Sequence, residues 1–338
     1  MKRLKTLIAL NEKPQIIEEQ TPHLFSTGVK VKTHFSAISP GTERLLIAGS
    51  VGERRNLGYS AVGQVIEVGK DVVDLKVGNL VACYGGPYVH HATELVVPAI
   101  LTAKIESRQQ LIHYAFAAHG TIAIHAIRQA NLQFGESVVI IGLGVLGQMI
   151  AKICVAAAYD VYCYEPNEER AAQFQQTTTA HVFSDLREME YFIEHSTQMQ
   201  GVDAVLLCAG GKYSETTNNS LKWVRKQGTI VIVGDVEPHF DRELMFGKEA
   251  IIKISRAGGP GRYDVQYEKM GCDYPYSYVR WTEGRNIKEF VRLVNNGLID
   301  MSAFIQYIVP FHESATIYDE LQQKPQYLTA ILSYEEEV

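Results

Sequence analysis

The sequence predicts an α/β protein in which a β-rich part is followed by a doubly wound parallel sheet. Residues 1 to about 120 contain short extended segments broken by glycines, whereas from about residue 121 apolar strand-like segments alternate with helix-like ones. Such alternation is typical of a parallel sheet with helices on both faces. At 338 residues the chain is long enough for two domains of ordinary size.

The first part is expected to form a compact β-barrel or sandwich. Its glycines Gly58, Gly63, Gly69 and Gly78 fall at predicted turns, as tight connections between antiparallel strands require. The extended segments are VKVKTHFSAIS, GYSAVGQVIEVG, GNLVACYGG and HHATELVVP.

The alternating part begins with a helix-like segment, TIAIHAIRQA, and a continuous apolar run, ESVVIIG. Such a run suits a parallel strand that is buried on both faces. The segments that follow are the helix LGQMIAKICVAAA, the strand DVYCYE, the helix NEERAAQFQQ, the strand VDAVLLCAG, the helical stretch NNSLKWVRKQ, and the strands GTIVIVG and IIKIS. After about residue 262 the alternation stops, and an irregular aromatic segment follows.

Composition excludes several classes of protein. The formal net charge of −6 and the scattered lysines and arginines make nucleic acid an unexpected partner. No stretch approaches the roughly 18 to 20 apolar residues that span a bilayer, and MKRLKTLIAL is expected to be a first strand. The five cysteines are odd in number and far apart, which indicates reduced thiols. We expect a soluble, cytoplasmic protein without a membrane partner.

A glycine-rich turn predicts a dinucleotide site. Gly142, Gly144 and Gly147 form G-x-G-x-x-G directly after an apolar strand and at the start of an apolar helix. The glycines allow a tight turn and close approach of a pyrophosphate, and the first helical N–H groups, around Val145 and Leu146, favour phosphate. The site is therefore predicted at these five residues.

Glu165 ends the next predicted strand, 18 residues after Gly147. Its carboxylate can bind the ribose hydroxyls and repel a 2′-phosphate, which favours NAD over NADP, although Arg170 lies close enough to alter that preference. Two further strand ends, at Cys208 and Gly234, are expected to line the same crevice near the nicotinamide. Simple turns at these two positions, and a solvated Glu165, are the alternatives.

These segments resemble the medium-chain dehydrogenase/reductase superfamily over essentially the whole chain. The resemblance begins with GTE at 41–43, which is similar to a Cys-Gly-Ser/Thr-Asp turn of the family and is therefore expected to be a turn. The other segments, which follow in the expected order, are GYSAVGQVIEVGKDV at 58–72, VGNLVACYGGPYVHHATELVVP, the glycine fingerprint, VDAVLLCAGG, GTIVIVG and NNGLIDMSAFIQYIVPFHESATIYDEL. The resemblance implies a GroES-like catalytic barrel formed by residues 1–120 and 263–338, with a Rossmann domain at 121–262. It also implies a homodimer through the last Rossmann strand, near IIKIS.

The departures from the family concern zinc. Zinc alcohol dehydrogenases hold a catalytic zinc with a cysteine, a histidine and a second cysteine, with an acidic residue beside the histidine. Here Pro40, Tyr59 and Ser60 stand at the first cysteine, the histidine and the acidic residue, and the second cysteine position falls within AAHG, which has no sulfur. The four-cysteine lobe of structural zinc is also missing. Because zinc requires Cys, His or carboxylate ligands, we expect no metal.

Four segments resemble one zinc-free branch of the superfamily. That branch includes bacteriochlorophyllide dehydrogenases and dehydrogenases fused to, or paired with, inositol-dehydrogenase-like proteins. The segments are GTERLL, GYSAVG, HHATELVVP and GGPGRYDVQYEKMGCDYPYSYVRWTEGRN.

Without zinc, a hydrogen-bond donor or general acid must serve the substrate oxygen while the nicotinamide carries the hydride. The resemblance places Tyr59, Ser60 and Thr42 at the cleft and brings His91 and His119 near it, and we favour Tyr59 or His91 as the acid. Tyr59 could instead fill the space left by zinc, Ser60 could cap a turn, and His91 could bond backbone. His119 and His125 are expected to pack near the domain junction, and Glu43 is either a base or part of an ion pair.

The segment from Tyr263 to Trp281 interleaves tyrosines with arginine. It is expected either to form a pocket wall for a planar, ring-shaped or anionic molecule, or to clamp the two domains together. The preceding run Gly258–Gly261 could act as a hinge.

The predicted function is zinc-independent, NAD-linked hydride transfer between nicotinamide and a secondary alcohol or ketone of a sugar, cyclitol or larger ring, which is a small-molecule substrate. Two alternatives remain: an NADPH-dependent quinone or enone reductase, and a non-catalytic dinucleotide-binding partner subunit.

Overall fold

The computed structural model describes residues 3–211, 215–324 and 326–334. Its contacts divide the chain into two compact units, which we call unit 1 (residues 1–121 and 258–338) and unit 2 (residues 122–257). The chain returns to unit 1 at residue 258, where the sequence analysis put the return at 263. The reason is that the Gly258 N–H already donates to the Tyr84 hydroxyl (2.8 Å), and the Asn286 side chain donates to the Gly258 carbonyl (2.8 Å).

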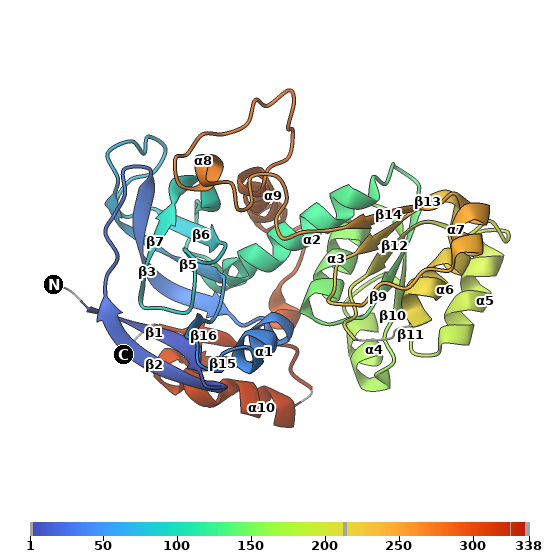
Figure 1. Ribbon diagram of the computed structural model, residues 1–338, viewed down its shortest axis with the longest axis horizontal. Coiled ribbons are helices and arrows are strands. Elements are labelled where there is room, and N and C mark those ends of the chain that lie inside the picture. Colours follow the sequence, from blue (N-terminus) through green and yellow to red (C-terminus); the bar gives the residue numbers. More distant parts are fainter. Residues whose placement is uncertain (1–2, 212–214, 325, 335–338) are drawn as a thin grey trace. The chain divides into compact units, whose positions relative to one another are not determined.

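Unit 1 contains two sheets (Figure 1). The larger follows the order β15-β16-β3-β5-β6-β8, with β7 also paired to β3, and the smaller follows β2-β1-β4. The strands are β1 (Arg3–Leu10), β2 (Lys13–Gln20), β3 (Gly28–Ala37), β4 (Arg55–Asn56), β5 (Ser60–Val68), β6 (Leu80–Tyr84), β7 (Glu94–Pro98), β8 (Thr102–Ile105), β15 (Ile308–Pro310) and β16 (Ile331–Ser333). The helices are α1 (Pro40–Ala48), η1 (Ala99–Leu101), η2 (Leu111–Phe116), α8 (Val265–Glu268), α9 (Glu283–Asn295), η3 (Ser302–Phe304), η4 (Phe311–Thr316) and α10 (Ile317–Gln323).

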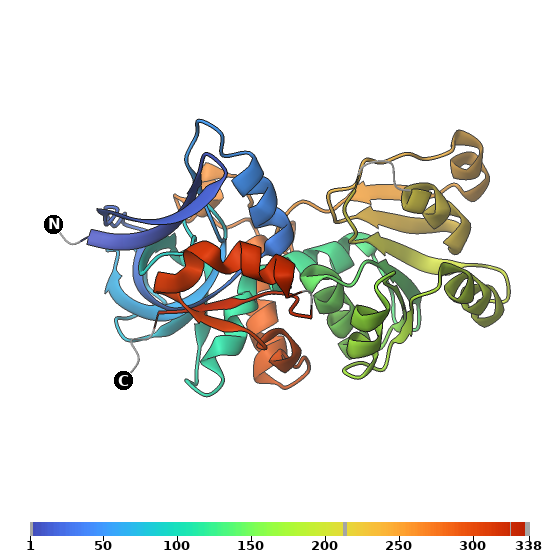
Figure 2. The same ribbon diagram turned by 90° about the horizontal axis from the view of Figure 1, so that it is seen from below.

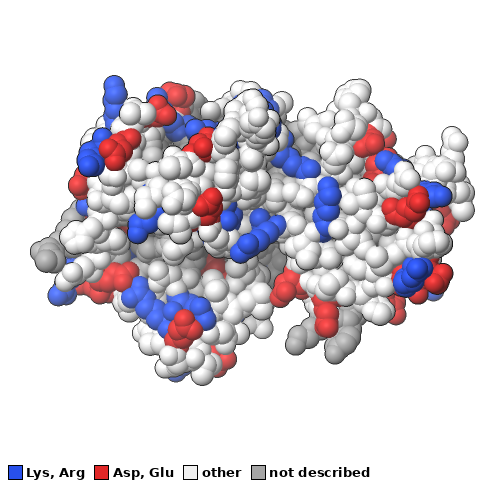
Figure 3. Space-filling view, turned by 45° about the horizontal axis from the view of Figure 1, so that its top comes forward, with Lys and Arg blue, Asp and Glu red and all other residues white. Residues whose placement is uncertain are grey.

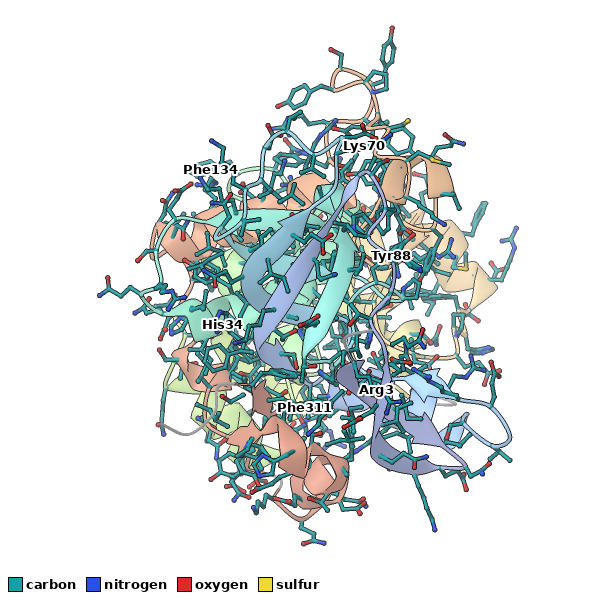
Figure 4. All side chains as sticks on the ribbon, turned by 90° about the vertical axis from the view of Figure 1, so that its left-hand side faces the viewer. Arg3, His34, Lys70, Tyr88, Phe134 and Phe311 are labelled. Carbon is teal, nitrogen blue, oxygen red and sulfur yellow. The ribbon has the colours of Figure 1, made fainter. Side chains whose placement is uncertain are left out.

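The core of unit 1 joins the two ends of the described chain. Leu7 of β1 and Leu332 of β16 belong to one buried apolar cluster, together with Phe311, which Figure 4 labels. The side chains of β1 alternate between exposed and buried at its start, as a strand with one face on a core requires. This cluster explains how residues after 300 belong to the same unit as the first strand.

The structure corrects two sequence expectations about helices. Residues 41–43, expected as a turn, lie in α1, which begins with Pro40 at its first position and has Glu43 in its first turn. The stretch NNSLKWVRKQ is helical only as far as Trp223, since Val224 is buried and starts β13 by pairing with Val202.

Unit 2 is a six-stranded sheet with the order β11-β10-β9-β12-β13-β14, in which every neighbouring pair is parallel. Helices cover both of its faces (Figures 1 and 2). The strands are β9 (Ser137–Ile141), β10 (Asp160–Tyr164), β11 (His181–Phe183), β12 (Val202–Leu207), β13 (Val224–Ile232) and β14 (Ile251–Ile254). The helices are α3 (Val145–Ala156), α4 (Glu168–Gln175), α5 (Leu186–Ser196), α6 (Glu215–Trp223) and α7 (Arg242–Lys248), and α2 (Ala117–Ala130) enters from unit 1.

Strand order reverses between β9 and β12, which is where doubly wound sheets bind ligands at the carboxyl ends of their strands. The α/β fold class predicted from the sequence is confirmed. In the described part of the chain, no helix combines the length and the apolar character needed to cross a bilayer.

Candidate functional site

The first candidate site is the dinucleotide loop, Gly142–Gly147, between β9 and α3. Gly142 has φ +92°, and an added Cβ would lie 2.9 Å from the Ala209 nitrogen. A Cβ at Gly147 would lie 1.9 Å from the Gly142 carbonyl oxygen. At Gly144 an added Cβ would meet no described atom within 4 Å, so this side of the loop is open to a ligand.

The helix that follows the loop presents free backbone donors. Its N-cap, Gly144, has no side chain to cap the first turn. The N–H groups around Val145 and Leu146 are therefore available, as they are at phosphate-binding helix starts. The Gln148 side chain donates to the Leu143 carbonyl (3.1 Å) and closes the loop from behind.

Glu165 holds this loop directly. Its Oε2 accepts from the Leu143 N–H (2.9 Å), and its Oε1 accepts from the Asn167 N–H (3.1 Å) and the Arg170 guanidinium (3.2 Å). The residue is buried, yet a carboxylate accepts about four hydrogen bonds, so one position stays open for a ribose hydroxyl. Contact with ribose remains a prediction.

The two other predicted strand ends meet the loop. The Cys208 N–H donates to the Ile141 carbonyl (2.8 Å), and a Cβ at Gly234 would lie 2.2 Å from the Ala209 oxygen. Since Ala209 also lies beside Gly142, the ends of β9, β12 and β13 lie together at one edge of the sheet. Burial raises the pKa of the Cys208 thiol to about 12, so this group stays protonated.

The second candidate site, in unit 1, is the hydroxyl cluster of Ser39, Thr42 and Tyr59. The Tyr59 hydroxyl donates to Ser39 Oγ (2.7 Å) at the start of α1, and Thr42 also hydrogen-bonds it. Burial raises the pKa of Tyr59 to about 12, with a smaller rise from Glu43 and partial offsets from the bonds to Ser39 and Thr42. Tyr59 is therefore a neutral hydroxyl donor near pH 7.

His91 lies in the interior with both ring nitrogens bound. Its Nε2 is 3.1 Å from Glu43 Oε2, and its Nδ1 is 2.7 Å from Ser36 Oγ. Glu43 is equally buried, also accepts from the Tyr318 hydroxyl, and accepts from the Ser39 N–H (2.7 Å) that begins α1. The pair thus fixes the start of α1, where Ser39 and Thr42 lie, and His91 is placed to hold Glu43.

Ser60, expected at the cleft, has its buried hydroxyl bonded within unit 1. The hydroxyl donates to the Ala115 carbonyl (2.6 Å) and accepts from the Ala118 N–H (2.9 Å). These bonds tie β5 to η2 and to the start of α2.

His119 is the group whose surroundings the sequence could not predict. It is buried, and among the described residues neither ring nitrogen has a hydrogen-bond partner. Its ring lies 5.4 Å from that of Tyr59, and burial lowers its pKa to about 4. A buried neutral imidazole without partners beside a hydroxyl donor marks a position where a ligand or water would be bound.

The residues present do not fit a catalytic zinc. Pro40, Tyr59 and Ser60 offer no ligand set, and within residues 3–211, 215–324 and 326–334 no three His, Cys, Asp or Glu side chains gather closely enough to hold a metal. Zinc prefers thiolate, imidazole and carboxylate ligands. The donors at this place are hydroxyl groups.

Comparisons with known proteins agree with this architecture. The family model described as "Zinc-binding dehydrogenase" matches residues 142–270, which exclude Pro40, Tyr59 and Ser60. D-guloside 3-dehydrogenase of Escherichia coli (strain K12) is 26% identical over 267 residues, covering 78% of this chain and 72% of that protein.

Solved structures share the fold. Galactitol-1-phosphate dehydrogenase from Escherichia coli matches with a TM-score of 0.79 at 16% identity, over 97% of this chain and 99% of that one. A protein described as a short chain alcohol dehydrogenase from E. coli CFT073, solved with NADH, matches with a TM-score of 0.79 at 15% identity, over 99% and 100%. Together the matches support an oxidoreductase enzyme.

Proposed function

We propose that this oxidoreductase belongs to the medium-chain dehydrogenase/reductase family, works without zinc and, with NAD, interconverts a secondary alcohol and a ketone on a sugar, cyclitol or larger ring. The observation that carries the proposal is the hydroxyl cluster, in which Tyr59, at the position that the resemblance assigns to the zinc-binding histidine, is a hydroxyl donor held by Ser39 and Thr42. The sugar-related names of D-guloside 3-dehydrogenase and galactitol-1-phosphate dehydrogenase support the substrate class.

Tyr59 is the group we assign to the substrate oxygen. When bound, a nicotinamide dinucleotide supplies the hydride chemistry of a dehydrogenase. Tyr59 would donate a hydrogen bond to the carbonyl oxygen of a ketone and then its proton, because an alkoxide is a stronger base than a phenolate. Ser39 and Thr42 orient that hydroxyl, and His119 behind it offers a neutral imidazole.

The test of Tyr59 is NADH oxidation with a panel of sugar and cyclitol ketones. Tyr59→Phe removes only the hydroxyl, and Tyr88→Phe, a tyrosine of the same unit outside the cluster, is the matched control. Loss of turnover in Tyr59→Phe alone supports the proposal. Equal turnover in both variants would contradict it.

NAD is favoured by Glu165, whose buried carboxylate lies at the loop. Calorimetric titration of the metal-free protein with NADH and with NADPH tests this choice, and tighter NADH binding supports it.

A second candidate function, an NADPH-dependent quinone or enone reductase, has one observation in its favour. Arg170 pairs with Glu165 at 3.2 Å, and its Nε has no partner among the described atoms. A guanidinium at that place could receive a 2′-phosphate. Tighter NADPH binding with activity on enones would move this candidate ahead.

We also propose a homodimer through β14. This strand is at the edge of its sheet, and Ile251 and Ile254 are 46% and 70% exposed. An exposed apolar edge strand is a ready site for pairing with a second copy. Light scattering should give a dimer for the native chain and a monomer for Ile254→Lys, whereas an unchanged mass for the variant would contradict this interface.

The five free thiols support a reducing, cytoplasmic location.

A further inference from the structure

The loop between α8 and α9, residues 269–282, is rich in tyrosine and arginine that the proposed function does not use. It forms the long orange loop in Figure 1. Both of its ends are anchored. Buried Tyr267 stacks on Tyr274 (centroids 5.4 Å apart) and donates to Thr282 Oγ1 (2.8 Å), while Tyr274 donates to Asp264 (2.5 Å). The loop is therefore a supported structure within unit 1.

Two of the three arginines in this region have internal acceptors. Arg262 donates to Glu268 (2.6 Å) and to the Gly86 carbonyl. Arg285 donates to Asp273 (2.6 Å) and to the carbonyls of Tyr274 and Val279. Asp273 is the loop's own carboxylate, and it is thus already paired. Arg285 thus holds the loop itself, and Arg262 holds the helix α8 that precedes it.

Arg280 is different. Its guanidinium lies 3.6 Å from the Trp281 ring centroid and 4.5 Å from that of Tyr276. The side chain is exposed, and among the described residues it makes no hydrogen bond and no ion pair. Stacking on aromatic faces restrains the plane of a guanidinium but leaves its N–H edges free. Those edges match the two oxygens of a carboxylate or phosphate.

We propose that Arg280, held against Trp281 and Tyr276, is a binding site for an oxyanion, either a carboxylate or a phosphate. Acidic and basic side chains are interspersed on the face shown in Figure 3, which carries no broad basic patch. Tyr278, which is 89% exposed, adds a ring surface in the same loop. The site shares no residue with the dinucleotide loop or the hydroxyl cluster, so it stands independently of the proposed function.

The test uses Trp281 as its reporter in the full chain. Tryptophan fluorescence and calorimetry follow titration with phenyl phosphate, benzoate, inorganic phosphate and neutral benzyl alcohol, and Trp281→Phe assigns the optical signal. We expect saturable binding of the anions and none of the alcohol. Arg280→Gln should weaken binding about tenfold or more, because charge-assisted hydrogen bonds are lost. Arg280→Lys keeps the charge but loses the paired N–H donors of the guanidinium, so its affinity for the anions should lie between those of the native chain and Arg280→Gln.

Arg242→Gln is the matched control. Arg242 also lies over a ring, Phe246 at 5.0 Å, but has a carboxylate partner in Glu243 at 3.5 Å. The Arg242→Gln variant should bind the anions with the affinity of the native chain. Phenyl phosphate binding more tightly than inorganic phosphate identifies a ring-bearing ligand, and equal affinities identify a free anion; both support the site. Equal affinity in Arg280→Gln and the native chain, or no saturable binding by either method, overturns it.

Discussion

The dinucleotide loop and the hydroxyl cluster are assembled from the sequence in different ways. The loop is continuous in the chain, and close contacts require two of its glycines: Gly142 lies against Ala209 at a neighbouring strand end, and Gly147 lies against the Gly142 carbonyl oxygen. The cluster depends on contacts between distant segments: Tyr59 meets Ser39 across 20 positions, and Tyr318 reaches Glu43 across 275. A site formed by one continuous segment can therefore be predicted from the sequence, whereas a site assembled from distant segments requires the structure.

The largest expected effect is on turnover at the hydroxyl cluster. Tyr59→Phe should lower the rate of ketone reduction by about 10²–10⁴-fold, the usual contribution of a positioned general acid, with NADH binding unchanged. Steady-state kinetics alongside NADH titration measure both. If the variant instead lost NADH affinity and kept its turnover, the division of labour between the two regions would be wrong.

Breaking the buried pair behind the cluster should chiefly affect stability. Glu43→Ala leaves His91 Nε2 and the Tyr318 hydroxyl without their acceptor and should cost about 3–5 kcal/mol. Glu53→Ala is the control, since its pair with Arg55 is exposed and should contribute about 1 kcal/mol or less. Chemical denaturation of both variants provides the comparison, and equal losses would remove the structural role of Glu43.

In the dinucleotide loop, substitution of one glycine should lower stability, and substitution of another should lower NADH affinity. Gly147→Ala forces a Cβ against the Gly142 oxygen and should destabilise unit 2 by about 1–3 kcal/mol. Gly144→Ala meets open space, so the protein should fold normally and lose NADH affinity, since the Cβ enters the space for the pyrophosphate. Thermal unfolding and calorimetry distinguish the two; normal NADH affinity in Gly144→Ala would place the cofactor elsewhere.

The pH profile should be flat. The pKa of Tyr59 is raised to about 12, so its proton is lost only as the pH rises through that value. The pKa of His119 is lowered to about 4, so its ring gains a proton only as the pH falls through that value. The cluster keeps one charge state between these limits, and reduction should proceed at a constant rate from about pH 6 to about pH 10. A transition near neutrality that vanished in Tyr59→Phe would contradict this assignment.

The smallest expected effect concerns cofactor choice. Arg170→Ala removes a partly exposed partner of Glu165, whose pairing is worth about 1 kcal/mol or less. The freed carboxylate should repel a 2′-phosphate more strongly, which raises the preference for NADH over NADPH by up to about fivefold. Competition binding of the two dinucleotides measures the change, and a fall in that preference would show that Glu165 does not face the ribose.

The elements with a local sequence signal could be predicted, whereas the partners of buried side chains could not. The fingerprint, β9 and α3 were predicted because strand, turn and helix signals occupy one short stretch. The turn expected at Thr42 is a helix, since Pro40 and Glu43 are also helix-start residues. Ser60 was expected at the cleft, but its partners Ala115 and Ala118 lie more than 50 positions away. No spacing rule could show that His91 has two hydrogen-bond partners whereas His119 has none among the residues that the structure describes.

The most direct test of the central claim is the activity of chelator-treated protein, with its zinc content measured in the same sample. We predict that protein containing no zinc still oxidises NADH with a ketone substrate at the rate of the untreated protein, and that Tyr59→Phe removes this activity. Loss of activity on zinc removal, with recovery when zinc is returned, would contradict it.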